Sequence, residues 1–139
     1  RFSSQREKKG STHSLLKIGL TLPRSILYAR NDRRIDDMIA GGLAGEVQRL
    51  LSQGYTPQLP SFSAIGYREI ASYLTGEISL DEAILLMKRN TRTYVRRQAN
   101  WFKLSDPTIR WFDLEQSGVS EILAWIGSGQ GWQLPTISI

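Results

Sequence analysis

The sequence predicts a mostly helical fold with two short strands, whose sheet is completed by residues that this chain does not contain. Apolar residues recur at helical spacings through most of residues 23–102, which is typical of amphipathic helices. The strand-like segments are residues 15–20 and 108–112, both short and rich in apolar side chains. Because two short strands hardly form a stable sheet, the remaining strands are expected outside the chain.

Three regions of different character are expected along the chain. Residues 1–14 are polar and basic and cannot bury enough apolar surface to order themselves, so we expect a flexible leader. Residues 15–126 carry the predicted helices and strands, and residues 127–139 form an irregular tail. A length of 139 residues suits one domain or part of one. Since the chain starts at Arg1 rather than at a methionine, we expect either a processing product or a cut inside a longer protein.

Two helices and a loop are predicted after the first strand. Pro23 suits the first turn of a helix that Gly41 and Gly42 end. A second helix follows at once, and Gly54 is placed to terminate it. Two prolines among polar residues then make residues 54–63 a loop.

Three further helices are expected beyond this loop. The first is short and covers residues 67–74. Ser79 and Glu82 have the spacing of a capping box, which starts a long helix that runs to about Phe102. A weaker helix is expected at about residues 119–126. The glycines after it are interpreted as a helix-terminating loop, since no helix follows that would complete a nucleotide-binding loop.

Composition narrows the class of protein. A net charge of +5 and a pI near 9.8 favour a polyanionic partner, although such an excess is common on proteins that bind no nucleic acid. The absence of cysteine excludes disulfides and thiolate metal sites. No apolar run approaches the roughly 20 residues that span a bilayer, and the start lacks the apolar stretch of a signal peptide. A soluble, cytoplasmic protein without a membrane partner is expected.

The long predicted helix gathers positive charge on one face. At about 100° per residue, five cationic side chains fall within roughly one quadrant, with Arg97 off to the side. The five are Lys88, Arg89, Arg92, Arg96 and Lys103. Apolar side chains on the opposite side are expected to pack inward, namely Ile84, Met87, Tyr94, Trp101 and Phe102. The basic face is either solvated surface or a phosphate-binding surface, and the lack of acidic residues between positions 88 and 103 favours the second.

Three motifs follow one another in a fixed order and spacing. They are SAIGYRE at Ser63–Glu69, YLTGEISLDEA at Tyr73–Ala83 and TRTYVRRQANWF at Thr91–Phe102. Upstream residues fit the same pattern, namely Leu22–Arg24, Leu27, Tyr28, Arg30, Arg33, Arg34, Met38, Gly42, Leu43, Glu46 and Val47. Together they closely resemble the C-terminal half of the tRNA dimethylallyltransferase family over about residues 15–113.

The resemblance implies transfer of a dimethylallyl group from its diphosphate to N6 of the adenine 3′ of a tRNA anticodon. In that family a P-loop and Mg²⁺ hold the diphosphate, and an acidic residue near the N-terminus deprotonates the amine. The chain contains no G-x-x-x-x-G-K-[ST] motif, so no catalytic residue and no metal ligand is assigned to it. What the resemblance implies is the C-terminal part of a monomeric P-loop-type α/β enzyme, inactive by itself, whose partners are tRNA and dimethylallyl diphosphate.

Two groups of tRNA-binding residues are implied by the same resemblance. They are Ser63, Ala64, Ile65, Gly66, Tyr67 and Arg68 in a turn, and Arg92, Arg96, Arg97, Gln98, Asn100, Trp101 and Lys103 on and after the long helix. Gly66 would let the backbone approach nucleotides, and Arg68 would neutralise a phosphate. Tyr67 and Trp101 either stack on bases or pack within the protein. Gln98 either reads a base edge or bonds a carbonyl.

Arg30 and Arg34 lie one helical turn apart and match arginines of the family. We expect Arg34, with Arg30 beside it, to bind the diphosphate of the prenyl donor, because a guanidinium bonds phosphate oxygens bidentately. The alternative is an ordinary solvated helix face.

Two other functions remain open from the sequence. One is a non-catalytic RNA-binding protein that retains the basic helix, whose RNA affinity would depend strongly on salt. The other is an adenylate prenyltransferase, which modifies a free nucleotide. The cluster of basic residues between positions 88 and 103 counts against this second possibility.

Overall fold

The computed structural model describes residues 15–129, which form two compact units. One unit is Pro23–Trp101, and the other joins the segment before Pro23 to the segment that starts at Phe102. The predicted leader, with His13, lies outside the described residues, as does the predicted tail from residue 130 onward.

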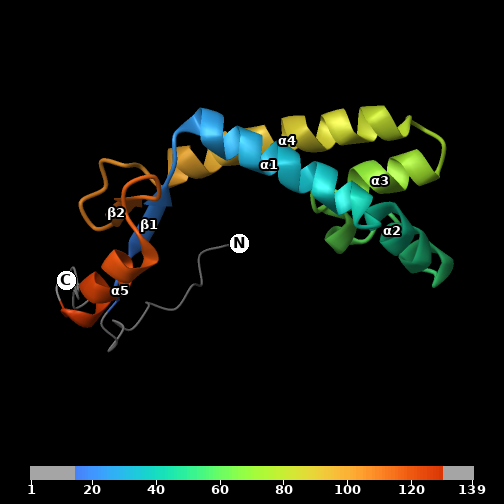
Figure 1. Cartoon of the computed structure of the whole chain (residues 1–139). Coiled ribbons are helices and arrows are strands. Elements are labelled where there is room, and N and C mark those ends of the chain that lie inside the picture. Colours follow the sequence, from blue (N-terminus) through green and yellow to red (C-terminus); the bar gives the residue numbers. More distant parts are fainter. Residues whose placement is uncertain (1–14, 130–139) are drawn as a thin grey trace, which may run out of the picture. The chain divides into compact units, whose positions relative to one another are not determined.

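All regular elements of the Pro23–Trp101 unit are helices. It contains the α-helices α1 (Arg24–Ala40), α2 (Leu43–Ser52), α3 (Tyr67–Leu74) and α4 (Leu80–Trp101), with a short 3₁₀ helix η1 (Pro60–Ser63) before α3 (Figure 1). The four α-helices confirm those predicted from the apolar spacing and glycine positions. The segment predicted as a plain loop contains η1, whose Phe62 is buried.

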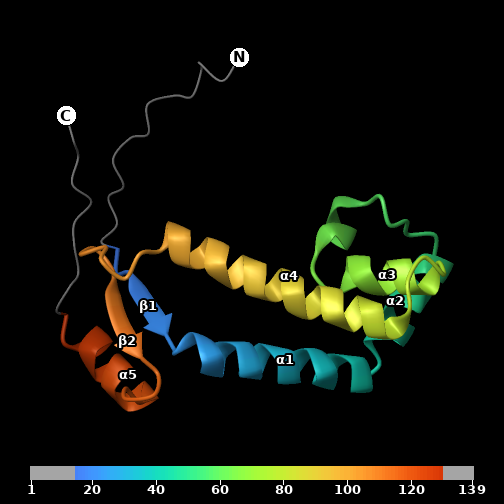
Figure 2. The same ribbon diagram turned by 90° about the horizontal axis from the view of Figure 1, so that it is seen from above.

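The core of this unit lies where α1, α2 and α3 meet the N-terminal half of α4. Val47 of α2, Ile70 of α3 and Met87 of α4 are fully buried in it, and Ile35 of α1 closes one side. Figure 2 shows α2 and α3 beside the end of α4 at which the helix begins. The C-terminal half of α4, beyond Met87, contributes no buried residue.

The start of α4 is fixed by the predicted capping box. The Ser79 hydroxyl accepts a hydrogen bond from the Glu82 backbone N–H at 3.2 Å, and the Glu82 carboxylate accepts one from the Ser79 N–H at 2.8 Å. These reciprocal bonds satisfy two N–H groups that the first helical turn leaves without partners. The Ser79 hydroxyl and backbone together lower the pKa of Glu82.

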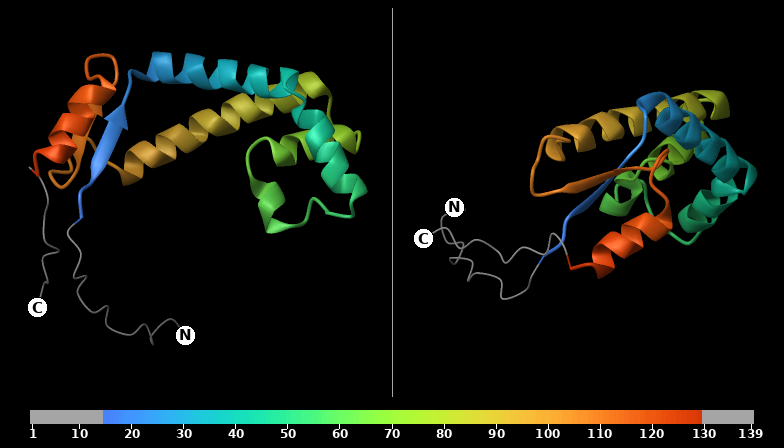
Figure 3. Two further views of the ribbon diagram at one scale, coloured as in Figure 1. Left: turned by 60° about the horizontal axis from the view of Figure 1, so that its bottom comes forward. Right: turned by 60° about the vertical axis from the view of Figure 1, so that its left-hand side comes forward.

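The second unit contains strands β1 (Ile18–Thr21) and β2 (Arg110–Asp113) and helix α5 (Val119–Gly127). The strands are parallel, with Gly19 opposite Trp111 and Leu20 opposite Phe112. Figure 3 shows α5 alongside this strand pair, and its Trp125 ring meets the buried Phe112 ring edge to face at 5.7 Å. The mostly helical fold with two short strands is the one that the sequence predicts.

Gly19 is required by close approach within this pair. A Cβ atom at this position would lie 2.3 Å from the indole ring of Trp111, far inside van der Waals contact. The glycine therefore lets Trp111 lie flat across β1. After α5, Ser128 and Gly129 end the helix, which agrees with a helix-terminating loop as far as the described residues reach.

Candidate nucleic-acid interface

The turn that precedes α3 presents two of the predicted RNA-binding side chains. Gly66 has φ 105°, a backbone conformation that favours glycine, and it is buried against the Met87 side chain. This turn directs the chain from η1 into α3, so Tyr67 and Arg68 are the first two residues of that helix. The Arg68 side chain is 56% exposed, which leaves it available to an external ligand.

A buried carboxylate holds this turn in place. Glu69 is 3% exposed and accepts three hydrogen bonds of 2.8 Å, from the Gly66 N–H, the Arg68 guanidinium and the Asn90 side-chain amide. Burial alone would raise the pKa of Glu69, but the bonds from Arg68, Gly66 and Asn90 together lower it. Because Asn90 belongs to α4, this carboxylate fixes the turn to the long helix.

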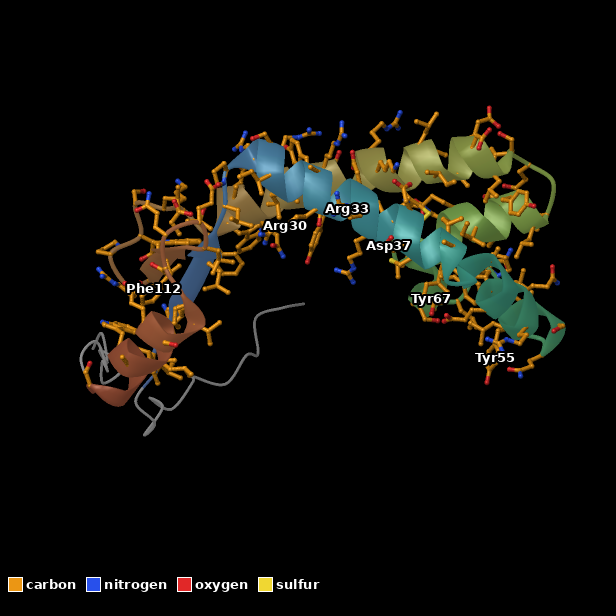
Figure 4. The ribbon with its side chains drawn as sticks, in the orientation of Figure 1. Arg30, Arg33, Asp37, Tyr55, Tyr67 and Phe112 are labelled. Carbon is orange, nitrogen blue, oxygen red and sulfur yellow. The ribbon has the colours of Figure 1, made fainter. Side chains whose placement is uncertain are left out.

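Tyr67 is oriented by two contacts. Its hydroxyl donates a hydrogen bond to the Glu46 carboxylate of α2, and its ring packs edge to face on Phe62 at 6.0 Å. The bond to Glu46, with burial and the negative charge of that carboxylate, raises the pKa of Tyr67. Tyr67 (Figure 4) is partly buried, so packing within the protein accounts for much of its surface.

Two cations of the basic helix face are neutralised by α1. Lys88 lies 2.7 Å from Asp36, and Arg92 lies 2.5 Å from Asp32 and over the Tyr28 ring. Because these acidic partners lie on another helix, the predicted uncompensated basic face is wrong at these two positions. Arg92 therefore joins α4 to α1, and its role in binding RNA stays a prediction.

The last turns of α4 differ from the expected inward packing. Ile84 and Met87 do pack on the core, but Tyr94 is 54% and Trp101 84% exposed. Phe102, at 56% exposed, follows the helix in the other unit. The prediction failed because α3 packs only on the first half of α4, and helical spacing does not show where a neighbouring helix ends.

The same turns of α4 leave several predicted RNA contacts exposed. Arg97 and Asn100 have no side-chain partner among the described residues, whereas Arg96 donates to the Thr93 hydroxyl at 3.0 Å. Gln98 donates to the Tyr94 hydroxyl at 2.9 Å rather than to a carbonyl, and its reading of a base edge stays a prediction. Lys103 lies beyond the end of α4, in the other unit, and so is not part of the helix face.

Helix α1 carries a separate group of arginines. Arg30 and Arg33 project from it in Figure 4, and Arg34 follows directly. All three are exposed, and none forms a salt bridge within residues 15–129. Arg30 and Arg34 are thus available for the diphosphate role predicted for them.

Comparison with known proteins identifies the family. The family model described as IPP transferase matches residues 1–105, which is most of the chain. The chain belongs to the IPP transferase family. The resemblance found in the three linked motifs is thereby confirmed.

Two sequence relatives of this IPP transferase chain are both named tRNA dimethylallyltransferase. A tRNA dimethylallyltransferase from Dehalococcoides mccartyi is 47% identical over 122 residues, covering 88% of this chain and 38% of the relative. Another tRNA dimethylallyltransferase, from Pelotomaculum thermopropionicum, is 46% identical over 111 residues, covering 80% and 35%. The chain thus spans little more than a third of the length of these relatives.

Solved structures of family members share the fold. A tRNA Δ(2)-isopentenylpyrophosphate transferase from Staphylococcus epidermidis matches with a TM-score of 0.75 and 35% identity, covering 82% of this chain and 36% of its own. The full-length tRNA isopentenylpyrophosphate transferase from Bacillus halodurans also matches with a TM-score of 0.75, at 38% identity, covering 86% and 39%. The helical arrangement described above is therefore that of IPP transferases.

Several residues that shape the site in this IPP transferase chain were missed by the sequence analysis. Glu69 and Asn90 hold the turn, Glu46 orients Tyr67, and Asp32 and Asp36 pair with α4. Only Glu69 carried a local signal, since it stands three residues after Gly66, as in a capping box. Asn90 and the three acids of α1 and α2 act across large separations in sequence, which no local pattern reveals.

Two other kinds of site are absent from the described residues. No helix among them is both long and apolar enough to cross a membrane. Within residues 15–129, no three His, Cys, Asp or Glu side chains come together as metal ligands.

Proposed function

We propose that this chain is the tRNA-binding part of a tRNA dimethylallyltransferase. The protein would transfer a dimethylallyl group from dimethylallyl diphosphate to N6 of the adenine 3′ of the anticodon. Residues of the same protein outside this chain would hold the diphosphate in a P-loop with Mg²⁺ and supply the catalytic base. Membership of the IPP transferase family and the shared name of its relatives support this proposal. We further propose that the enzyme is a cytoplasmic monomer.

One observation carries the tRNA-binding role. The buried Glu69 joins the turn at Gly66 to Asn90 of α4, so two segments proposed to contact tRNA belong to one rigid group of helices. The first segment presents the exposed guanidinium of Arg68. The second presents Arg96 and Arg97 at the far end of α4. Guanidinium groups fixed in this way would position the phosphate backbone, as phosphate contacts do in protein–nucleic acid complexes generally.

Exposed aromatic residues would supply base contacts beside these cations. Trp101 follows Arg97 by one helical turn and is 84% exposed, which suits stacking on an unpaired nucleotide. Extruding the adenine costs a few kcal/mol of lost stacking, so side chains that stack on loop bases would stabilise the extruded state. The other residues proposed to contact tRNA are Ser63, Ala64, Ile65, Tyr67, Arg92, Gln98, Asn100 and Lys103.

Replacement of Trp101 tests this role directly. Trp101→Ala should weaken binding of an anticodon stem–loop RNA by about 1–3 kcal/mol, the range for one base stacked on an aromatic ring. Because the side chain is exposed, the free energy of unfolding should change by less than about 0.5 kcal/mol. Binding is measured by fluorescence anisotropy and stability by urea unfolding, with Trp101→Phe as the variant that retains stacking. Unchanged RNA affinity in Trp101→Ala would refute the stacking role.

A further inference from the structure

A pocket lies between α3 and α4, on the surface next to the turn at Gly66. Its volume is about 310 Å³, and Arg68 and Ser72 line it from α3 while Arg89 and Asn90 line it from α4. Pockets of about this size and upward hold small ligands. The lining combines these charged and polar side chains with the aliphatic Ile78 and Leu86, and the buried Glu69 forms part of its wall.

The charges of this pocket leave one cation uncompensated. The carboxylate of Glu69 is occupied by its three donors and is matched in charge by Arg68. Arg89 is exposed and, within the described part of the chain, forms no salt bridge. Its neighbours on the basic face differ, since Lys88 and Arg92 are held by acids of α1. The lining residues thus carry one net positive charge, that of Arg89, while Ser72 donates a hydrogen bond to the Glu77 carboxylate at 2.8 Å.

Arg68 keeps donors for a ligand as well. One of its terminal nitrogens donates to Glu69 at 2.8 Å, and a guanidinium has five N–H donors. The Asn90 amide donates to the same carboxylate, so the position of its side chain is fixed. Two guanidinium groups from different helices thus border one pocket, a donor arrangement that suits the oxygens of a phosphate.

We propose that this pocket seats one phosphodiester group of the bound RNA and that Arg89 is a phosphate-binding residue. The inference rests on the proposed function and extends it, because Arg89 is not among the residues that the family resemblance implies. The pocket adjoins the turn proposed to contact tRNA, which supports the RNA as the source of the phosphate. Arg68 borders the pocket and also belongs to the turn proposed to contact tRNA.

Substitution of Arg89 tests the inference in the intact protein with an anticodon stem–loop RNA. Arg89→Ala and Arg89→Gln should each weaken binding about tenfold, near the lower end of the range for hydrogen bonds to a charged group. The slope of log K against log salt should become shallower by about 0.7–0.9, as expected when one phosphate contact is lost. Arg89→Lys should retain most of the slope and part of the affinity, since it keeps the charge but not the fork.

The matched control is Arg49→Ala. Arg49 is an exposed arginine in the last turn of α2 and does not line the pocket, so it tests the loss of one positive charge alone. The control should leave the salt slope unchanged. Equal effects of Arg89→Ala and Arg49→Ala would overturn the phosphate contact. Failure of the unsubstituted protein to bind the RNA would instead overturn the proposed function.

Addition of inorganic diphosphate distinguishes an RNA phosphate from a free phosphate ligand as the occupant of the pocket. The NMR signal of the Arg89 side-chain Nε–H should shift on addition of the stem–loop RNA and stay in place on addition of millimolar diphosphate. A shift of equal size with diphosphate alone would assign the pocket to a free phosphate ligand and overturn the inference.

Discussion

At the scale of single residues, the Glu69 carboxylate accepts hydrogen bonds from three donors that lie apart in the sequence or belong to different groups. Its carboxylate binds the backbone of Gly66, the guanidinium of Arg68 and the amide of Asn90. A buried carboxylate is stable only when its lost hydration is replaced by such bonds. The geometry of the turn proposed to contact tRNA therefore depends on a buried, ionised side chain.

Conversion of this carboxylate to an amide should have a pH-dependent cost. At pH 7 Glu69→Gln should lower the free energy of unfolding by about 1–3 kcal/mol, because an amide cannot accept from all three donors. The pKa of Glu69 is lowered by folding, so its stabilisation is present above the ordinary value of 4.5 and is lost as the pH falls through the folded value. The difference between the two proteins should therefore shrink at low pH.

Urea unfolding at several pH values measures this difference. Asp37→Asn is the matched control, since Asp37 is an exposed carboxylate of the same unit without a salt bridge among the described residues. The control should change stability by less than about 0.5 kcal/mol at pH 7. A difference for Glu69→Gln that stays constant with pH would show that ionisation of Glu69 is not what holds the turn.

A second prediction for a single residue concerns Arg34, which we expect to contact the diphosphate of the prenyl donor. Arg34→Ala in the complete enzyme should raise the KM for dimethylallyl diphosphate by about tenfold or more, the loss expected for hydrogen bonds to a charged group. The KM for tRNA should change much less. Steady-state kinetics with each substrate varied in turn provide both values, and an unchanged KM for the prenyl donor would remove the assignment.

At the scale of elements, a glycine in β1 allows a large aromatic side chain of β2 to pack across that strand. Gly19 in β1 leaves room for the Trp111 ring, and Phe112 from the next position of β2 is buried against Trp125 of α5. Side chains of a strand alternate between its faces, so Trp111 and Phe112 cover opposite sides of the pair. Any side chain at position 19 would displace the indole ring.

Paired glycine substitutions test this packing. Gly19→Ala should destabilise the unit that contains β1 and β2 by about 1–3 kcal/mol through overpacking. Gly45→Ala in α2 adds the same methyl group where nothing lies within 4 Å, and should be neutral or stabilising by up to about 1 kcal/mol. Thermal unfolding followed by Trp fluorescence and circular dichroism compares them. Similar stability of both variants would mean that Trp111 does not lie across Gly19.

The helices were largely predictable from the sequence, whereas the parts of each helix that other helices bury were not. Capping at Ser79 and helix termination at Gly42 and Gly54 are local signals, and the helices begin and end close to them. The exposure of Tyr94 and Trp101 depends instead on how far α3 extends along α4, which is a property of tertiary structure. The same holds for Asp32, which pairs with Arg92 from 60 positions away.

At the scale of the whole molecule, we propose that tRNA binding and catalysis belong to different parts of one protein. This chain matches about a third of its relatives, and the residues described here are assigned to RNA binding. Family resemblance identified the turn and the end of α4 as the candidate site, but the structure shows the pairing of Lys88 and Arg92 and the exposure of Trp101. Charge pairing between helices therefore decides which basic residues of α4 remain without an acidic partner among the described residues.

The most direct test of the central claim is nucleoside mass spectrometry of tRNA from cells that express the complete gene encoding this sequence. The host should lack its own dimethylallyltransferase, so any dimethylallyl adenosine in the tRNA comes from the expressed protein. We expect this nucleoside to appear at the position 3′ of the anticodon, and its amount to fall when Trp101 is replaced by alanine. Soluble protein that binds tRNA but leaves it unmodified would contradict the enzymatic role and indicate a non-catalytic RNA-binding protein.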